Sequence, residues 1–370
     1  MREFKDIKKI LVIKLRHIGD VLLTVPVFRA LRETFPNAYI SALVNSGTEE
    51  ALAGNPLIDE LIVFNRNIKK KSTIQKYIEE LSFLKAIRGR GFDMAIDLTS
   101  GDRAAIISLI AGAKYRLAYD PAKDGFLGKR YFYTHLAQRN GNQHMVLQNL
   151  DLVKQFGIST DDPKVDFYIP DEARLFVRRI FEENNIKAND TVVHVHPTSR
   201  WLFKCWKDEY MAEVIKWLIG QRVKVIMTSS PDKREMGKAK KILSLVSDPS
   251  HPTIVEGGDG GVIDLCGKTN IKQLAAISEA SDLFLGVDSA PMHIAAAVGT
   301  SVIALFGPTD DVQWRPWNDK TIVIKESLQC MPCKKGACEG MPLRKCMESI
   351  EPNVVKNIIR EILLRNAKHS

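Results

Sequence analysis

The sequence predicts an α/β protein built from two Rossmann-like, doubly wound domains that face a central cleft. Short apolar runs recur through both halves of the chain, and segments with helical periodicity separate them. The runs are continuous rather than alternating, which is typical of parallel strands buried on both faces. Regular alternation of strands and helices is typical of a doubly wound sheet. The length of 370 residues fits two domains of ordinary size.

In the first half, four apolar runs predict strands, and helical segments lie between them near residues 20–34, 72–88 and 102–111. The runs are Ile10–Leu15, Tyr39–Val44, Leu61–Phe64 and Met94–Leu98. The alternation then pauses over Gly157–Ala173, which contains acidic residues, two prolines and little periodicity. We therefore expect the linker here and the first domain to span residues 1–165. Asp171 is placed to cap the helix that follows.

The second half repeats the pattern, and we expect its domain to span residues 166–350. Its strand-like runs are Thr191–Pro197, Val223–Ser229, Leu283–Ser289, Ser301–Gly307 and Thr321–Lys325. A last helix lies within residues 351–370, and packing back on the N-terminal domain is one option for it. In open α/β sheets, ligands bind at the carboxyl ends of the strands, so a cleft between two such edges is the expected site.

The composition excludes several classes of protein. Hydrophobic residues make up 45% and charged residues 26%, as in soluble globular chains, and no apolar run reaches the roughly 20 residues of a membrane span. No apolar signal core follows the charged N-terminus, so we expect a cytoplasmic protein. The net charge of +9 is concentrated in residues 1–170. This excess is either solvated surface or a face for a polyanion or an anionic membrane. Nucleic acid is disfavoured, because no helix carries a dense basic stripe with interleaved aromatic residues.

Four of the six cysteines fall close together near the C-terminus, at Cys330, Cys333, Cys338 and Cys346. Disulfides are disfavoured in a chain without an export signal. Two interpretations stay open. The thiols either hold a structural metal, although zinc ribbons usually pair two C-x2-C knuckles and only one occurs here, or they pack in reduced form within a tight loop.

The first strand-to-helix turn, "KLRHIGDVLLTVPVFRAL" (Lys14–Leu31), has a single glycine, Gly19, and an acidic residue, Asp20. A carboxylate at this place would repel a phosphate. No G-x-G-x-x-G follows any strand and no G-x-x-x-x-G-K-[ST] occurs, so nicotinamide enzymes and P-loop enzymes are disfavoured. The chain also lacks a D-x-D triplet, with which many transferases hold a metal. A phosphate site must therefore be sought in the second half.

Two loops of the second half carry groups suited to a nucleoside diphosphate. In "HPTSRWLFKCW" (His196–Trp206), Thr198 and Ser199 offer hydroxyls and backbone N–H groups, and Lys204 offers a positive charge. The alternative is an ordinary polar loop. In "SSPDKREM" (Ser229–Met236), Glu235 lies in a first helical turn, where it can reach a ribose diol or serve only as a helix N-terminal charge.

The segment "FLGVDSAPMHIAAAVGTSVIALFGPTD" (Phe284–Asp310) reads as a strand, a polar turn, a small-residue helix and another strand. Asp288, Ser289 and Ala290 stand at the strand-to-helix junction, and His293 follows on the first turn. One interpretation is a sugar-phosphate pocket at a helix N-terminus. The other is that Asp288 caps the helix and His293 is a surface residue.

These stretches, together with "ILVIKLRHIGDVLLTVPVFRAL" and "CMPCKKGACEG", resemble the ADP-heptose:lipopolysaccharide heptosyltransferases, glycosyltransferase family nine. The likeness runs in order through essentially the whole chain. Within the family, the chain is most similar to the heptosyltransferase III branch. The stretches "HIGDVLLT" and "GVDSAPMH" are its specific parts. The resemblance implies a GT-B fold, ADP-L-glycero-β-D-manno-heptose as donor, no metal or other cofactor for catalysis, and inversion at the anomeric carbon.

Carried over by motif position, the resemblance implies that Asp20 is the general base. It implies a pyrophosphate site at Thr198, Ser199 and Lys204. Glu235 would hold the ribose of the donor.

The same resemblance implies that Asp288 contacts the heptose hydroxyls. The backbone at Ser289–Ala290 and the His293 side chain would complete the pocket, and Lys268 would lie in the adenine-side wall. This chain carries Ser-Ala at 289–290, where Thr-Gly is frequent in the family. This difference bears on how the donor packs in the pocket more than on the reaction.

The implied acceptor is the inner core of lipopolysaccharide, with its Kdo and heptose residues, at the inner face of the cytoplasmic membrane. Its anionic groups would match the basic first half, with Arg16, Arg103 and Arg130 as candidate contacts. Three alternatives stay open: another donor or acceptor within the same family, a non-catalytic nucleotide-sugar-binding protein of core assembly, and plain surface charge at each arginine. An epimerase of the same fold is disfavoured, because these loops do not resemble the epimerase signature.

Overall fold

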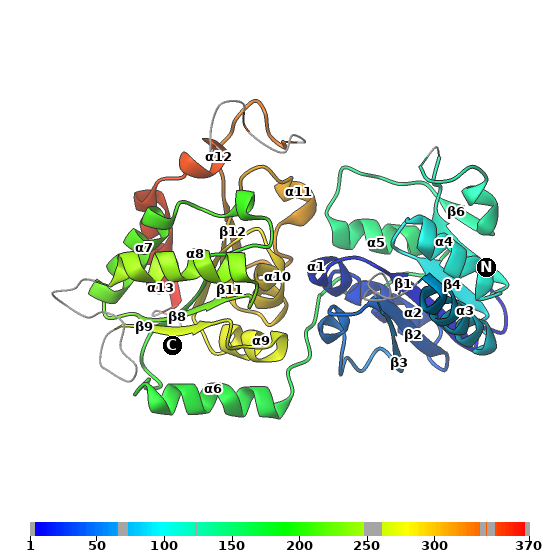
Figure 1. The fold of residues 1–370 in the computed structure, drawn as a ribbon, viewed down its shortest axis with the longest axis horizontal. Helices are drawn as coiled ribbons and strands as arrows, with labels where there is room; N and C mark the ends of the chain where they lie inside the picture. Colours follow the sequence, from blue (N-terminus) through cyan, green and yellow to red (C-terminus); the bar gives the residue numbers. More distant parts are fainter. Residues whose placement is uncertain are drawn as a thin grey trace. The chain divides into compact units, whose positions relative to one another are not determined.

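The computed structural model describes residues 4–65, 73–122, 124–247, 261–333, 338 and 345–366. The chain folds into two compact units, and the first passes into the second between Tyr168 and Ile169. Figure 1 shows both units. The division lies three residues beyond the boundary expected after residue 165, within the linker expected over Gly157–Ala173.

The first unit contains a wholly parallel sheet with the strand order β3-β2-β1-β4-β5-β6 among the described residues. Its strands are β1 (Lys9–Lys14), β2 (Tyr39–Asn45), β3 (Glu60–Phe64), β4 (Met94–Asp97), β5 (Tyr115–Tyr119) and β6 (His135–Ala137). The first four coincide with the predicted runs, and their buried apolar residues explain why the sequence revealed them. The sequence did not predict β5 and β6, which are short and partly polar.

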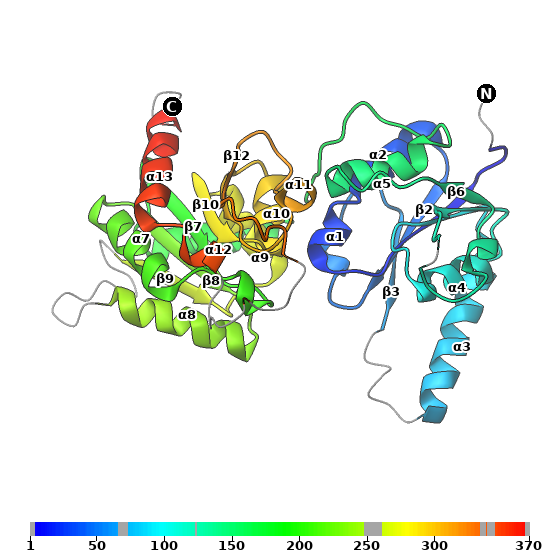
Figure 2. The ribbon, with the colours of Figure 1, turned by 90° about the horizontal axis from the view of Figure 1, so that it is seen from above.

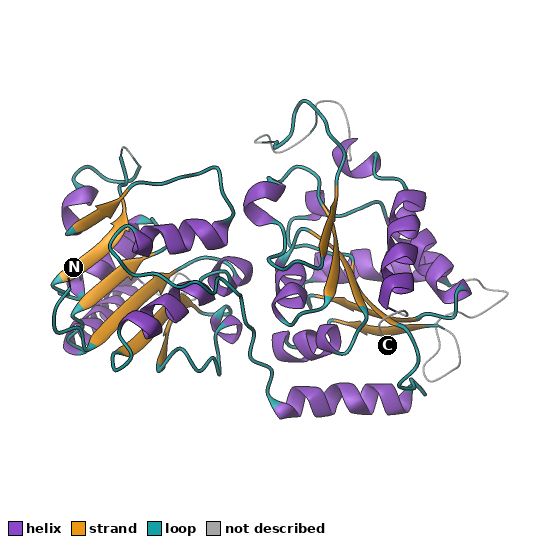
Figure 3. Cartoon of the chain, turned by 180° about the vertical axis from the view of Figure 1, so that it is seen from behind, coloured by secondary structure: helices purple, strands orange, loops and turns teal. Residues whose placement is uncertain are grey.

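Helices cover both faces of this sheet, with α2 and α5 on one side and α3 and α4 on the other (Figures 2 and 3). The helical segments are α1 (Ile18–Leu22), α2 (Val25–Thr34), η1 (Glu49–Ala51), α3 (Thr73–Gly89), α4 (Asp102–Ile110), η3 (Lys129–Phe132) and α5 (Met145–Lys154). In α2, Pro26 occupies the first turn, where its missing N–H has no cost, and Val27, Phe28 and Leu31 are buried.

The second unit repeats the architecture with the strand order β12-β11-β10-β7-β8-β9, again wholly parallel. Its strands are β7 (Val192–His196), β8 (Lys224–Ser229), β9 (Val262–Cys266), β10 (Leu283–Val287), β11 (Ser301–Leu305) and β12 (Thr321–Ile324). The prediction of two doubly wound α/β units is therefore confirmed. Of these strands, β9 was missed.

The helices of the second unit again lie on both faces of the sheet, with α7, α8 and α13 on one side and α9 and α10 on the other (Figure 1). The segments are α6 (Asp171–Glu183), η4 (Leu202–Lys204), α7 (Asp208–Gly220), α8 (Lys233–Val246), α9 (Ile271–Glu279), α10 (Ala290–Ala297), α11 (Asp311–Trp314), α12 (Lys345–Glu348) and α13 (Pro352–Asn366).

The C-terminal helix α13 does not belong to the first unit, which corrects one option left open by the sequence. Its apolar residues Val355, Ile359 and Ile362 are buried in the core of the second unit, where α13 packs on α7. The expectation for Asp171 is also wrong. Pro170 occupies the N-cap position of α6 and Asp171 is the first helical residue.

A polar chain crosses the otherwise apolar core of the second unit. The Thr228 hydroxyl lies 2.7 Å from Nε2 of His194 and 2.8 Å from Nδ1 of His196, and Nδ1 of His194 lies 2.8 Å from the Ser278 hydroxyl. Burial lowers the pKa of His196 to about 3 and holds the pKa of His194 well below its usual value. Both imidazoles are therefore neutral, and each satisfies its polar neighbours inside the sheet.

These two histidines predict a loss of stability in acid. Their folded-state pKa values lie below the unfolded value of about 6.5, so protons bind preferentially to the unfolded chain as the pH falls from about 6.5 toward 3. For His196, with a folded pKa of about 3, the free energy of unfolding should be about 2 kcal/mol lower at pH 5 than at pH 7, and His194 should lower it further. All five tryptophans lie beyond residue 200, so tryptophan fluorescence during urea denaturation follows the second unit selectively.

The matched variant is His196→Gln, which should remove the contribution of His196 to this pH effect, about 2 kcal/mol between pH 7 and pH 5. An unfolding transition of the second unit that is equal at pH 7 and pH 5 would contradict the assignment of two neutral buried histidines.

Candidate active site

The strand order of the second unit reverses at β7, which lies between β8 and β10. Because all the strands are parallel, the loops that follow β7 and β10 leave the same edge of the sheet side by side. Such a reversal is where open α/β sheets bind their ligands. Most of the predicted donor-site residues belong to the segments that follow β7, β8 and β10.

An ion pair joins the two loops at this reversal. Nζ of Lys204, at the end of η4, lies 2.7 Å from Oδ2 of Asp288, directly after β10. The side chains are 19% and 7% exposed, so the pair is largely withdrawn from water. The Ser199 hydroxyl donates to the Asp288 carbonyl at 3.5 Å, which adds a second link between the loops. Lys204, Ser199 and Asp288 therefore form one cluster, and the sequence did not predict the pairing of Lys204 with Asp288.

A second link connects the loop after β7 with α8. The Thr198 hydroxyl donates to Oε2 of Glu235 at 2.9 Å, and both residues are buried. Asp232 caps α8 by accepting from the Arg234 N–H, which sets Glu235 in the first turn. The Thr198 hydroxyl therefore points at Glu235 and not at solvent. In this structure its side chain holds Glu235 in position and is not presented to a ligand.

The junction between β10 and α10 contradicts the interpretation in which Asp288 caps the helix and His293 is a surface residue. Ser289, not Asp288, is the N-cap residue, and its hydroxyl donates to the Val287 carbonyl at 3.1 Å instead of capping the helix. Asp288 faces Lys204. His293 is 5% exposed, so the alternative that it is a surface residue is wrong. Ala290 begins α10, as predicted.

Lys268 follows β9, in a loop tied to the end of β8 by the Gly267 N–H, which donates to the Ser229 carbonyl at 3.0 Å. Its ammonium donates to the Asp264 carbonyl at 2.9 Å at an exposed position. Lys268 therefore lies on the same edge of the sheet as Glu235, two strands from the ion pair.

The first unit has the same reversal, at β1, which lies between β2 and β4. Asp20 is in the first turn of the short helix α1, which follows β1, and its side chain is half-buried. Gly19 beside it is buried. Leu15 N–H donates to the Thr99 hydroxyl at 2.8 Å, and the Arg16 guanidinium donates to the Thr99 carbonyl at 3.2 Å. Asp20 thus stands at the edge of the sheet where β1 and β4 both end.

Sequence reasoning missed several charged residues at this edge. Lys14, the last residue of β1, is buried and donates to the Leu98 carbonyl at 2.9 Å and to Oδ1 of Asn149 at 3.2 Å. Burial lowers the pKa of Lys14 to about 8, an effect that the negative charge of Asp20 opposes. The positive charges of Arg16 and Arg139 also lower the pKa of Lys14. Asp20, Arg16 and Arg139 therefore all lie close enough to Lys14 to act on its charge.

Asp97, the last residue of β4, is also buried. Tyr133 donates to its Oδ2 at 2.6 Å, and the backbone N–H groups of Thr99 and Ser100 donate to its Oδ1 at 2.7 and 3.0 Å. Burial raises the pKa of Asp97, and these hydrogen bonds oppose the rise. The signal that could have revealed Lys14 and Asp97 is a charge at the end of an otherwise apolar run.

Two further cations meet at Ser100, which has a left-handed backbone with φ of 58°. Arg139 donates to the Ser100 hydroxyl at 2.7 Å, and Lys129 donates to its carbonyl at 3.0 Å. Arg139 is exposed, whereas Lys129 is buried and pairs with Asp102 at 3.1 Å. Arg139 is therefore an additional candidate for holding an anionic ligand at this edge.

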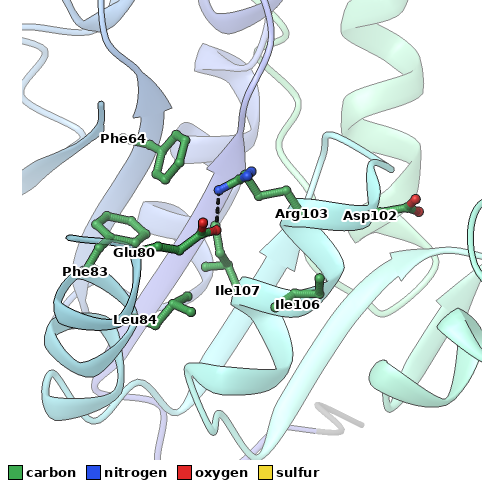
Figure 4. A pocket seen from close by; sticks show the side chains of 8 residues that line it. All are labelled: Phe64, Glu80, Phe83, Leu84, Asp102, Arg103, Ile106 and Ile107. Carbon is green, nitrogen blue, oxygen red and sulfur yellow. Dashed lines mark hydrogen bonds and ion pairs between the residues drawn. The ribbon is translucent and has the colours of Figure 1, made fainter. Parts of the chain in front are cut away.

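The other predicted acceptor residues are engaged elsewhere in the first unit. Arg103 forms an ion pair with Glu80 at 2.6 Å and lies 4.7 Å from the centre of the Phe64 ring. It lines a pocket of about 320 Å³ between α3 and α4 (Figure 4). Arg130 is exposed and lies 3.8 Å from Asp120. Of the three arginines, Arg16 is the one that the hydrogen bonds place directly beside the end of β4.

The cysteine cluster does not form a metal site in the described part of the chain. Cys330 is exposed, Cys333 and Cys338 are half-buried, and Cys346 is packed in the core of the second unit. Among the described residues, which include all four, no three His, Cys, Asp or Glu side chains are arranged to hold a metal ion. The structure therefore gives no support to the structural-metal alternative. Across the same described residues, no helix is both long and apolar enough to cross a membrane.

The family profile described as glycosyltransferase family 9 (heptosyltransferase) matches residues 80–343. This match covers more than half of the chain and includes every predicted donor-site residue. The chain belongs to glycosyltransferase family 9. The family resemblance seen in the sequence is thereby confirmed, and the protein is a glycosyltransferase.

Individual relatives of this family-9 chain are also heptosyltransferases by name. It is 31% identical over 308 residues to lipopolysaccharide heptosyltransferase 3 of Escherichia coli, covering 83% of this chain and 86% of that one. Among solved structures, E. coli ADP-heptose lps heptosyltransferase II aligns with a TM-score of 0.76 and 19% identity, over 97% of this chain and 99% of that one. E. coli heptosyltransferase WaaC with ADP aligns with a TM-score of 0.72 and 20% identity, over 96% and 99%. These structures share the fold, which is the GT-B fold predicted for this family-9 enzyme.

The Thr198–Glu235 hydrogen bond in this family-9 enzyme generates a prediction about stability. Thr198→Val keeps the shape of the side chain but leaves a buried carboxylate oxygen without its donor. We expect the free energy of unfolding of the second unit to fall by about 1–3 kcal/mol, measured by urea denaturation with tryptophan fluorescence. Thr198→Ser, which keeps the hydroxyl, is the control and should lose much less. Equal losses in the two variants would show that the hydroxyl is not what matters.

Proposed function

We propose that this enzyme transfers L-glycero-D-manno-heptose from ADP-heptose to the inner core of lipopolysaccharide, in the manner of a heptosyltransferase III. The observation that carries the proposal is the cluster of Lys204, Ser199 and Asp288 at the strand reversal of the second unit, in a chain 31% identical to lipopolysaccharide heptosyltransferase 3. Structures of WaaC with ADP and with ADP-2-deoxy-2-fluoro heptose support an ADP-sugar as the donor.

In this proposal the second unit binds the donor. Lys204 neutralises the diphosphate, with the first N–H groups of α10 near Ala290 contributing their partial positive charge. Asp288 accepts from heptose hydroxyls, and Glu235 accepts from the ribose. The diphosphate then competes with Asp288 for the Lys204 ammonium, so donor binding rearranges the ion pair that the ligand-free protein contains. His293 and the Ser289 backbone complete the pocket, and Lys268 lies on the adenine side.

Asp20 of the first unit is the general base of the proposed reaction. Its carboxylate takes the proton from an acceptor heptose hydroxyl while that oxygen forms a bond to the anomeric carbon. The bond from the anomeric carbon to the diphosphate oxygen breaks at the same time, and its electron pair leaves with ADP. Attack from the face opposite ADP inverts the anomeric centre. Lys204 balances the charge that develops on the leaving group, so the reaction needs no metal.

The acceptor side of the proposal rests on the cations of the first unit. Arg16 stands at the same sheet edge as Asp20, and Arg139 lies close by beside Ser100. Carboxylates and phosphates of an inner core would be held by such guanidinium groups. Arg130 and Arg103 contact more distant parts of the acceptor. Arg103 must first break its ion pair with Glu80. Because this acceptor is anchored in a membrane, the enzyme works at the inner face of the cytoplasmic membrane.

The test is incubation with ADP-heptose and defined truncated core oligosaccharides in the presence of EDTA, with the product read by mass and by the anomeric configuration of the new linkage. We expect addition of one heptose with inversion. Asp20→Asn should lower kcat by about 10²–10⁴-fold, because the base is lost, and should leave the affinity for ADP unchanged.

Lys204→Ala is the contrasting variant, since it should weaken ADP binding and turnover together. Near-normal turnover of Asp20→Asn would eliminate Asp20 as the base. An unchanged ADP titration curve for Lys204→Ala would eliminate the diphosphate site, and loss of all turnover in EDTA would contradict metal-independent transfer.

A further inference from the structure

Helix α3 of the first unit carries apolar side chains on two opposite faces. On its inner face, Ile87 is fully buried, and Phe83 and Leu84 pack against the same core cluster. A surface helix ordinarily needs only this one apolar face, and its other side is polar. The outer face of α3 departs from that pattern.

The outer face exposes four large apolar side chains. Ile74, Tyr77, Ile78 and Leu81 are 73%, 66%, 61% and 66% exposed. Their spacing of three, four and seven residues places them on one stripe of about 100° along the helix. Single exposed apolar residues are ordinary, but a continuous stripe of four marks a surface that meets an apolar partner. In Figure 2 this part of α3 extends beyond the body of the first unit.

Charges on α3 are segregated between the two sides. Lys85 and Arg88 follow Leu81 by four and seven residues, so they continue the stripe at exposed positions, and the Arg88 guanidinium lies over Gly112 beyond the end of α4. Glu80 instead turns inward to pair with Arg103 at 2.6 Å, as Figure 4 shows. Glu79 lies about 100° around the helix from Ile78, which is itself at the edge of the stripe, so Glu79 is likewise off the stripe. The outer face is therefore apolar and cationic, without a carboxylate among its described residues.

Neighbouring elements extend this character. Helix α4 packs against both α3 and η3, and it exposes Ile106 and Leu109 to 40% and 38%. At η3, Tyr131 is 80% exposed next to the exposed Arg130. Three adjacent elements of the first unit thus expose large apolar residues beside basic ones.

We propose that the outer face of α3, formed by Ile74, Tyr77, Ile78, Leu81, Lys85 and Arg88, is the surface with which the enzyme docks on an anionic phospholipid bilayer. This inference deepens the proposed function, on which it rests for the presence of a membrane-anchored acceptor. A helix lying in the bilayer interface buries an apolar stripe among the acyl chains and holds cations at the lipid phosphates. The stripe, its length and its cations match that requirement.

A second copy of this chain fits the face less well. A two-fold contact through α3 would set the same groups against themselves, and the outer face offers no carboxylate to Lys85 and Arg88. An anionic bilayer supplies both the apolar layer and the negative charge.

The test is co-sedimentation of the full-length protein with vesicles of phosphatidylcholine, with and without phosphatidylglycerol. Wild-type protein should bind the anionic vesicles. The double substitution Ile78→Glu and Leu81→Glu should lower the ratio of bound to free protein at least about tenfold, because it puts two charges into the apolar stripe. Leu175→Glu, which changes a similarly exposed leucine on α6 of the second unit, is the matched control and should bind like the wild type.

Two further readouts separate this inference from the proposed function. Heptose transfer to a deacylated, water-soluble core acceptor should be unchanged in the double variant, which also shows that it is folded. Normal transfer with undiminished vesicle binding would overturn the docking surface alone. Absence of transfer by the wild type would overturn the proposed function and leave the vesicle comparison intact. A double variant that changes only the oligomeric state would show that the face binds a second copy.

Discussion

The reversal of strand order beside the first strand of each sheet is the constraint on which the rest of the molecule depends. All strands of a parallel sheet end at the same edge, so a reversal sets two loops from distant parts of the sequence next to each other. In the second unit this brings Lys204 to Asp288, 84 residues away. In the first unit it brings Leu15 to Thr99, also 84 residues away. Each unit therefore has one place where charged groups from two loops converge, and the proposed donor and base residues lie at these two places.

The two places are built differently, in keeping with different tasks. The second unit ties its loops with a largely buried ion pair and a buried hydroxyl–carboxylate hydrogen bond, so a cation and carboxylates are held in position before a ligand arrives. The Thr198–Glu235 hydrogen bond fixes Glu235 before the proposed donor binds, whereas the proposed diphosphate would take the place of Asp288 at the Lys204 ammonium. The first unit leaves Asp20 half-buried and Arg16 and Arg139 exposed around a buried lysine. Such an open arrangement suits a large, anionic and hydrated acceptor.

Sequence reasoning found the fold because its signal is local. Buried parallel strands such as Ile10–Ile13 and Leu283–Val287 are apolar throughout, whereas the short and partly polar β5 and β6 give little signal. The predicted donor residues could be located because motif positions fix them after the strand ends. Their pairing could not, since the contact of Lys204 with Asp288 and of Thr198 with Glu235 depends on which loops become neighbours.

The same limitation explains the groups that were missed. Lys14, Asp97 and the His194–Thr228–His196 chain are polar residues inside or at the end of apolar strands, and their partners come from elsewhere in the fold. The apolar residues of α3 have ordinary helical spacing, and only the packing of the first unit shows that one of its two apolar faces remains uncovered.

We propose that an ADP-sugar binds at the strand reversal of the second unit and that the first unit supplies the base and the acceptor site. Hydrogen–deuterium exchange with and without ADP separates these two roles. ADP should slow exchange in peptides covering residues 197–206 and 288–293, with little change in the peptide covering residues 15–24. Protection at residues 15–24 without protection of the two second-unit segments would contradict it.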